Sequence, residues 1–340
     1  MKVGLFVDAR NPPAWERPWA SHYETLLARI VEAEALGIGS VWLTEHHFFE
    51  DGYLPQPLTL AAAIAARTER IRIGTAVFLV ALRRALDVAE QAALVDLISG
   101  GRLELGLGAG YRVPEFEAFD TPIERRYALL EEHASEIKRL WEQGGFTPAP
   151  LQQRAPLWIG SHGPRGARIA GRLGAGMLSF APAVQQPYRE ALAEAGYGAE
   201  RARLTGMANL VLSDDPEAAW ARIAPHLAYQ WSSYARYGAE GRERGGKTTA
   251  AAPLAGLDGD LDPQSLRSKG PDMSQPNFDV VTPEDAVARL RAWLGELPVE
   301  TVYFSHSVAG MPDELVARHV ELLATRVAPE IAELGRGAAA

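Results

Sequence analysis

The 340-residue sequence contains no cysteine. Disulfide bonds, thiolate metal sites, iron–sulfur clusters and a cysteine nucleophile are therefore excluded. Runs of lysine and arginine are also missing, and acidic residues outnumber basic ones, giving a formal net charge of −9. Because nucleic-acid binding relies on basic side chains that neutralise phosphates, we expect no nucleic-acid partner.

Long apolar stretches are missing as well. No run reaches the roughly 18 residues that suggest a membrane-spanning helix. In the first segment, MKVGLFVDAR, the apolar run is short and ends at Asp8. A signal peptide needs a longer apolar region, so this segment predicts a first strand. We therefore expect a cytoplasmic protein without membrane contact. The 47% hydrophobic content is typical of a globular protein and is sufficient for a large core.

Short apolar runs alternate with longer amphipathic segments, a pattern typical of βα units around a parallel sheet. Strands are expected near residues 2–8, 39–44, 71–77, 102–107, 156–161, 176–180, 203–212 and 299–306. Helices are expected near residues 21–36, 57–67, 87–98, 124–142, 164–174, 185–196, 214–228, 282–295 and 312–329. This alternation favours an α/β fold of the (β/α)₈ TIM-barrel type, with residues 1–340 as one domain, over a doubly wound open sheet.

Residues 238–280 interrupt this alternation with many Gly, Pro, Ser and charged residues. A long insertion in a compact domain is typical of an active-site lid or of surface decoration, and both readings stay open. Just before it, Tyr229, Trp231 and Tyr234 belong to an aromatic cluster that also includes Tyr237. Such residues pack in a core or line a pocket, and their place beside the candidate lid makes them candidates for substrate binding.

The sharpest local motif is Thr44-Glu45-His46-His47-Phe48, directly after the second expected strand. The carboxyl ends of barrel strands collect the active site, so polar residues there are candidates for catalysis. Adjacent side chains on an extended backbone point to opposite sides, and we expect one histidine to face the pocket. The alternative is a hydrogen-bonded histidine with a structural role. No HxH or HExxH pattern accompanies these residues, so we expect no metal.

Two glycine-rich turns follow later strands. In Gly106-Leu107-Gly108-Ala109-Gly110-Tyr111 the dinucleotide-binding fingerprint fails, because Tyr111 occupies the place of the third glycine. These glycines either let a flat ligand approach the backbone or only satisfy a tight loop. The second turn, Gly160-Ser161-His162-Gly163, opens a helix. Free backbone N–H groups and the helix dipole suit a phosphate there, although the same residues also make ordinary turns.

Together these segments resemble the bacterial luciferase-like flavin-dependent monooxygenases over nearly the whole chain outside residues 230–280. The resemblance is carried by TEHHF at 44–48, IGTA at 73–76, residues 89–111, GSHGP at 160–164 and VTPEDAV at 281–287. It implies a (β/α)₈ barrel that holds reduced flavin mononucleotide (FMN) at its mouth. There dioxygen would form a flavin hydroperoxide that oxidises a small organic substrate. It also implies a separate flavin reductase and a homodimer.

The resemblance also implies roles for individual residues. His46 matches the pocket histidine of the family, an acid–base group or a donor to the flavin–oxygen adduct. The Ala76–Val77 bond matches a position where many members carry a non-prolyl cis peptide behind the flavin ring. Ser161, His162 and Gly163 match the phosphate-binding turn. Further cofactor-binding residues implied by the match are Gly108, Tyr111 and Tyr127, the last beside the phosphate.

The chain also departs from this family pattern. Where the light-emitting subunit of luciferase has a cysteine followed by an arginine, Gly108 and Ala109 stand here. The departure argues against light emission and against tight flavin binding, because one side chain beside the flavin and one phosphate partner are missing.

Three alternatives remain at this point. The deazaflavin F420 is used for hydride transfer on the same fold, often with an aspartate where this chain has Glu45. A metal-dependent hydrolase on the same barrel would use His46, His47 and His306. A third alternative is a non-catalytic, flavin-binding partner subunit.

Overall fold

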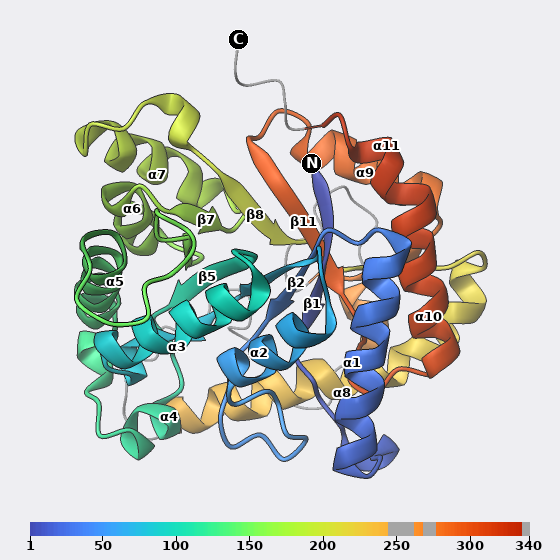
Figure 1. Ribbon diagram of the computed structural model, residues 1–340. Helices are drawn as coiled ribbons and strands as arrows, with labels where there is room; N and C mark the ends of the chain where they lie inside the picture. Colours follow the sequence, from blue (N-terminus) through green and yellow to red (C-terminus); the bar gives the residue numbers. More distant parts are fainter. Residues whose placement is uncertain (244–261, 268–276, 335–340) are drawn as a thin grey trace.

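The computed structural model describes residues 1–243, 262–267 and 277–334, and it shows a closed barrel of parallel strands surrounded by helices (Figure 1). Within the described residues the strand order is β3-β2-β1-β11-β8-β7-β6-β5, and β3 pairs with β5 to close the barrel. These strands are β1 (Lys2–Val7), β2 (Ser40–Leu43), β3 (Arg72–Thr75), β5 (Leu103–Gly108), β6 (Leu157–Gly160), β7 (Gly176–Leu178), β8 (Leu204–Met207) and β11 (Val299–Ser305). The predicted (β/α)₈ barrel is confirmed.

Helices cover the outside of the barrel at all the predicted places. They are α1 (Trp19–Leu36), α2 (Pro57–Arg67), α3 (Ala85–Ser99), α5 (Arg126–Gln143), α6 (Pro164–Leu173), α7 (Pro182–Glu194), α8 (Pro216–Glu243), α9 (Pro283–Leu294) and α10 (Asp313–Leu322). Residues at the helix ends explain where several helices begin or stop. Gly37 and Gly100 adopt the left-handed conformation directly after α1 and α3. At the start of α9, the Thr282 side chain accepts a hydrogen bond from the Asp285 N–H. A π-helical turn then connects α10 to α11 (Ala328–Ile331).

The barrel interior is filled by large aromatic side chains that face glycines. Trp42 and Trp158 cross at 89° with ring centres 5.9 Å apart. A β-carbon on Gly74 would lie 2.3 Å from the Trp42 ring, and one on Gly176 would lie 2.2 Å from the Trp158 ring. These two glycines are required because any side chain would displace an indole. The barrel is thus a packed core with its chemistry at one end, as the fold demands.

Four expectations about individual elements need correction. The strand expected at 203–212 is two strands, β8 and β9 (Leu210–Leu212), and β9 leaves the barrel to pair in parallel with β10 (Asp279–Val281). Strand β10 was not predicted, because three residues next to an irregular segment give no periodic signal. Helix α4 (Val113–Ala118) lies where no helix was expected. Helix α8 continues beyond its expected end near 228 and ends at Glu243.

The candidate lid at 238–280 falls mostly outside the described residues, at 244–261 and 268–276. Residues 238–243 continue α8, and residues 279–281 form β10. The aromatic cluster therefore lies within a long helix and not at its end. Among the described helices, none has both the length and the apolar character needed to cross a membrane.

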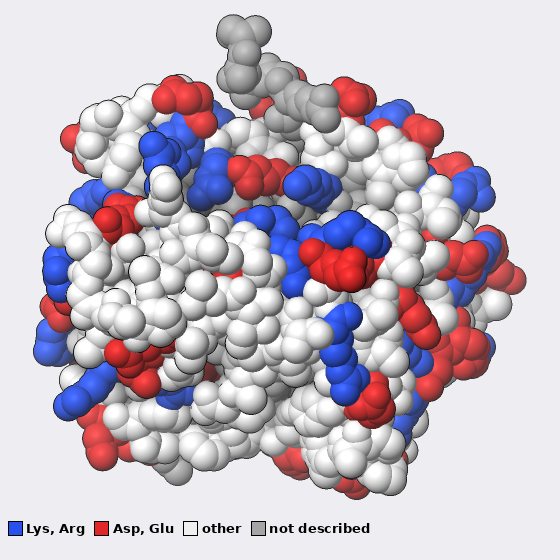
Figure 2. Space-filling view, viewed as in Figure 1, with Lys and Arg blue, Asp and Glu red and all other residues white. Residues whose placement is uncertain are grey.

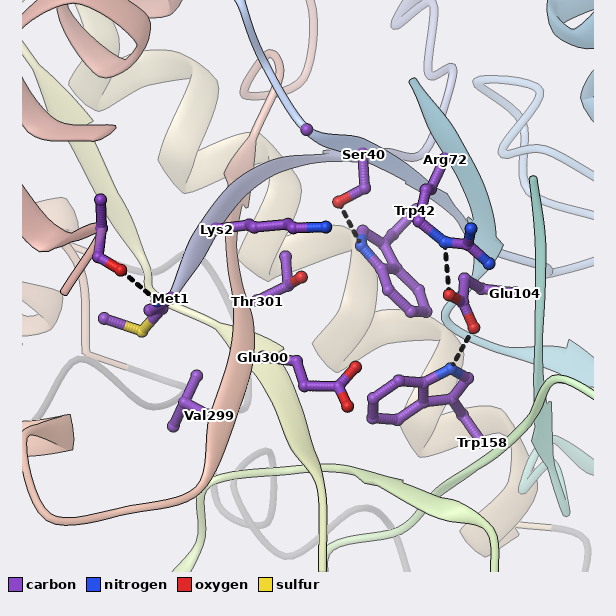
Figure 3. A pocket seen from close by; sticks show the side chains of 12 residues that line it. Met1, Lys2, Ser40, Trp42, Arg72, Glu104, Trp158, Val299, Glu300 and Thr301 are labelled. Carbon is purple, nitrogen blue, oxygen red and sulfur yellow. Dashed lines mark hydrogen bonds and ion pairs between the residues drawn. The ribbon is translucent and has the colours of Figure 1, made fainter. Parts of the chain in front are cut away.

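A hollow of about 440 Å³ opens at the amino ends of the strands (Figure 3). It is lined by the first residues of several barrel strands and by the two interior tryptophans. Trp42 donates its indole N–H to Ser40 Oγ at 2.9 Å, and Trp158 donates to Glu104 Oε2 at 2.7 Å. Since reactive groups in such barrels gather at the carboxyl ends, we assign this end a structural role.

Candidate active site

The loop that follows β2 is tied to the carboxyl end of β1. His46 N–H donates to the Leu54 carbonyl at 3.1 Å, and Leu54 N–H donates to the Asp8 carbonyl at 2.9 Å. The side chain of His46 is buried. This pairing turns the polar residues after β1 and β2 toward one rim of the barrel.

His46 is held between a carboxylate and a phenol. Its Nδ1 lies 2.9 Å from Glu115 Oε1, and its Nε2 lies 3.3 Å from the Tyr111 hydroxyl. Burial alone raises the pKa of Glu115, but His46, Arg112 and the His47 N–H together hold it below its usual value. Glu115 is therefore an ionised carboxylate, and it accepts a hydrogen bond from the Nδ1–H of His46.

Tyr111 completes the environment of the imidazole. Burial raises the pKa of Tyr111, so its hydroxyl stays protonated and donates to Nε2 of His46. Nε2 is then the basic nitrogen, on the side of Tyr111. Such an arrangement can accept a proton in the site and return it, as a general acid–base group does.

His47 has different partners, as the alternation of side chains predicts. Its Nε2 lies 3.0 Å from Glu45 Oε1, and its ring lies 4.9 Å from that of Phe119. Glu45 also accepts from the Leu79 N–H and from Arg83 Nη2. Glu45 and His47 thus form a separate buried network that fastens the rim to β4 (Phe78–Leu79).

Four aromatic rings surround His46. Their ring centres lie 5.2 Å (Phe49), 4.9 Å (Tyr53), 5.4 Å (Tyr111) and 6.3 Å (Tyr234) from the imidazole centre. Three of them meet His46 edge to face, and Phe49 stacks on it. The wall is apolar apart from its hydroxyl groups, which limits the access of water to the histidine.

The Ala76–Val77 peptide bond is cis, as the resemblance predicts, and both residues are half-buried. The Val77 side chain fills the space beside two glycines. A β-carbon on Gly108 would lie 2.2 Å from Val77 Cγ2, and one on Gly160 would lie 2.3 Å from Val77 Cγ1. Val77 thus occupies the space that a side chain at position 108 would need, and binding of a flat ligand beside Gly108 stays a prediction.

The turn between β6 and α6 presents polar groups at a helix N-terminus. Gly163 N–H donates to Ser161 Oγ at 3.2 Å, no side chain caps α6, and His162 is exposed. The Arg165 guanidinium lies 4.9 Å from the centre of the Tyr127 ring. The structure thus brings Tyr127 next to this turn, and these groups fit an anion such as a phosphate. Arg165 was not among the expected site residues.

Comparison with known proteins places this geometry in a family. Residues 1–301 match the family model described as luciferase-like monooxygenase. The chain belongs to this family. A solved structure of the monooxygenase RslO1 from Streptomyces bottropensis superposes with a TM-score of 0.73 at 26% identity, covering 97% of this chain and 99% of that one.

Curated relatives of this luciferase-like protein use two kinds of cofactor by name. The F420-dependent glucose-6-phosphate dehydrogenase of Amycolatopsis mediterranei is 31% identical over 53% of this chain and 60% of its own length. The oxygenase component of the flavin-dependent trigonelline monooxygenase of Acinetobacter baylyi is 28% identical over 50% of this chain and 51% of its own. The chain thus spans just over half the length of these two relatives.

The three residues expected to bind substrate lie apart on α8. Tyr234 joins the aromatic wall, and its hydroxyl lies 2.9 Å from that of Tyr53. Trp231 is buried in a hydrophobic cluster with residues of β9 and β10, where its ring contacts Tyr234. Tyr229 is half-buried, and its hydroxyl donates to Glu50 at 3.5 Å. Of the three, only Tyr234 faces His46.

His306, which belongs to the hydrolase alternative, directly follows β11 and is buried in this luciferase-like protein. Burial lowers its pKa to about 3, and the charged groups around it belong to α1 and α10, Arg29 foremost. Across the described ranges, no group of three or more His, Asp or Glu side chains could hold a metal ion. The three histidines proposed for a hydrolase are thus not brought together.

Several site residues were missed from the sequence. Glu115 and Arg112 flank the start of α4, in a stretch where no helix was expected, although Pro114 and the spacing of three residues are a helix-start signal. Asp8 and Arg10 follow the first strand at the same rim, yet only Asp8 was noted, as the end of an apolar run. Their place at a strand's carboxyl end was the available signal.

Proposed function

We propose that this chain is the oxygenating component of a flavin-dependent monooxygenase. It takes reduced FMN from a separate reductase and uses dioxygen to oxidise a small organic substrate. The observation that carries the proposal is His46, held between Glu115 and Tyr111 at the barrel rim. The family's description as monooxygenases supports it.

The residues present fit FMN as the cofactor. The α6 N-terminus, Ser161, Arg165 and Tyr127 would hold the phosphate, and Ala76 and Val77 would support the ring system from the barrel mouth. Bound reduced FMN supplies the electrons that activate dioxygen. The protein's own share is to hold the ring, keep water away with the aromatic wall, and hold or deliver a proton at Nε2 of His46.

F420-dependent hydride transfer is the second candidate, favoured by the 31% identity to an F420-dependent dehydrogenase. Against it, Glu45 stands where F420 members often have an aspartate. Here its carboxylate is already engaged by His47, Leu79 N–H and Arg83. We therefore place FMN first.

The deciding experiment mixes the protein with photoreduced FMN without oxygen, then admits oxygen and follows the flavin absorbance. A delay in reoxidation relative to free reduced FMN supports the monooxygenase. Absence of both binding and delay, together with tight binding of F420 in a parallel titration, would favour hydride transfer instead.

We further propose a homodimer formed through α2 and α3. Figure 2 shows a wide area without Lys, Arg, Asp or Glu over these helices. Leu86, Leu94 and Ile98 are all exposed on α3, at 46%, 49% and 52%. Exposed apolar surface of this extent is typical of a protein interface. A cytoplasmic location remains a prediction from the sequence.

A further inference from the structure

Asp8 lies at the carboxyl end of β1 and on its inward face. Phe6, two residues earlier, stacks on Tyr303 inside the barrel with ring centres 5.8 Å apart. Because side chains alternate along a strand, Asp8 continues the same inward row at the rim. Its side chain keeps 11% of its surface exposed, whereas those of Arg10 and Asp51 keep none.

Behind Asp8 lies a buried ion cluster. Arg10 Nε lies 3.9 Å from Asp8 Oδ2 and 3.4 Å from Asp51 Oδ2, and Arg10 Nη2 donates to Ser233 Oγ on α8 at 3.0 Å. The Arg10 N–H also donates to Asp8 Oδ1 at 3.3 Å. The guanidinium is therefore fixed from both β1 and α8, and it fixes the carboxylate in turn.

Some polar atoms of this ion cluster make no hydrogen bond to the described part of the protein. Arg10 Nη1 and Asp51 Oδ2 are buried without a hydrogen-bond partner in the described part of the chain. Replacing a buried ion cluster by apolar packing of the same volume often leaves stability unchanged or raises it, so stability alone does not require these charges. Buried polar groups left in this state are typical of a site that receives a ligand or ordered water.

The ion cluster beside Asp8 lies against the aromatic wall around His46. Tyr53 and Tyr234 each lie 4.8 Å from the Arg10 guanidinium carbon and also contact His46. The ion cluster and the catalytic histidine thus share the same two rings. A flat ring compound that packs against them reaches both groups.

Burial raises the pKa of Asp8 to about 6, with Arg10 opposing this shift and Asp51 adding to it. The other titratable groups that interact with Asp8 are Tyr53 and Tyr234. Above about pH 6 the carboxylate is ionised, and it can exchange a proton near neutral pH.

We propose that Asp8 is a second acid–base residue of the site, which binds a hydroxyl group of the substrate and accepts its proton, with Arg10 as the positioning residue. The substrate O–H bond breaks and a carboxyl O–H bond forms. The electron pair stays on the substrate oxygen and is delocalised onto the carbon next to the one that bears this oxygen, which becomes electron-rich. The substrate class is therefore a flat phenol or enol, because a straight-chain aldehyde has no such proton. This inference rests on the proposed function.

The test compares two probes that differ only in that proton, 2-naphthol and 2-methoxynaphthalene. Their affinities for the full-length protein are measured by fluorescence titration at pH 7.5. A hydrogen bond to a charged group corresponds to a preference of about tenfold for 2-naphthol. Asp8→Asn should abolish this preference and Asp8→Glu should keep part of it. Asp87→Asn, an exposed aspartate on α3, should bind both probes as the unsubstituted protein does.

A pH series provides a test that does not depend on folding of a variant. In the unsubstituted protein the preference should disappear below about pH 6, when Asp8 becomes protonated. An unchanged preference in Asp8→Asn, a preference that persists at pH 5, or no binding of 2-naphthol at millimolar concentration would each overturn the proposal. The same samples are tested for delayed reoxidation of reduced FMN. If the unsubstituted protein does not delay reoxidation relative to free reduced FMN, the proposed monooxygenase function is contradicted. If it delays reoxidation but does not prefer 2-naphthol, only the role of Asp8 is contradicted.

Discussion

Glu115 Oε1 lies 2.9 Å from Nδ1 of His46, and this contact decides which imidazole nitrogen carries the proton. The same oxygen accepts the His47 N–H at 2.9 Å, and Arg112 Nη1 lies 3.2 Å away. An ionised carboxylate can only accept hydrogen bonds, so Nδ1 carries the proton and donates a hydrogen bond to Glu115. Nε2 is therefore unprotonated and accepts a hydrogen bond from the Tyr111 hydroxyl. Outer partners of this kind fix the orientation of a catalytic imidazole.

His46→Ala should keep the fold and reduce product formation by about 100-fold or more, because the acid–base group is removed. Glu115→Gln should reduce it by about 10- to 100-fold, since the tautomer is no longer fixed. Because both residues act as one unit, the double variant should be no slower than His46→Ala. Product formation and reoxidation of bound reduced FMN are measured in parallel. Glu117→Gln on the same helix is the matched control, and near-normal turnover of His46→Ala would remove His46 from catalysis.

The turn at α6 predicts discrimination between flavins with and without a phosphate. Anaerobic titration should show that reduced FMN binds more tightly than reduced riboflavin. Arg165→Ala should weaken FMN binding by about tenfold and leave riboflavin unchanged, because a charged partner of the phosphate is lost. Arg172→Ala, exposed at the other end of α6, is the control. Equal losses for both flavins in Arg165→Ala would mean that Arg165 supports the fold rather than the phosphate.

Val77 lies so close to Gly108 that the effect of a side chain at position 108 on stability should depend on the size of the side chain at position 77. Gly108→Ala should lower the free energy of unfolding by about 1–3 kcal/mol, because its β-carbon has no room beside Val77 Cγ2. Val77→Ala in the same protein should restore most of the loss, as urea unfolding would reveal. Gly163→Ala is the control, since a β-carbon there meets nothing within 4 Å. A double variant as unstable as Gly108→Ala would place the strain elsewhere.

The barrel was predictable from the sequence because each βα unit carries its own periodic signal, and the His46 motif was predictable because it follows a buried strand. What could not be predicted depends on contacts between distant segments. Glu115 meets His46 across 69 positions, and Arg10 meets Ser233 across 223. The contact between Gly108 and Val77 could not be predicted for the same reason, because Val77 lies in the segment between β3 and β4, far from Gly108 in the sequence.

Two buried histidines predict that acid destabilises the protein. Burial lowers the pKa of His306 to about 3 and that of His319 to about 4. In the unfolded chain both protonate near pH 6.5, so stability is complete above that value and falls as pH drops toward 3. Asp8, whose pKa is raised, acts in the opposite direction as pH falls through 6.

His306→Phe separates these effects, because both proteins then carry the same Asp8 and His319. Its free energy of unfolding should exceed that of the unsubstituted protein by a margin that grows by about 1.4 kcal/mol per pH unit below 6.5. Nε2 of His306 makes no hydrogen bond to the described residues, so little is lost at neutral pH. Urea unfolding between pH 7.5 and 4.5 measures the margin. Parallel curves for the two proteins would contradict a buried neutral His306.

The apolar face of α3 predicts the last outcome. Leu94→Glu together with Ile98→Glu should convert a dimer into a monomer, because the free energy needed to desolvate two carboxylates exceeds the free energy gained from the apolar contact. Light scattering on a sizing column measures the mass directly. Leu36→Glu on α1, where a leucine is similarly exposed at 42%, should leave the dimer intact. If the unsubstituted protein is itself monomeric at micromolar concentration, the face serves another partner, and the reductase that must deliver reduced FMN is then the first to test in the same assay.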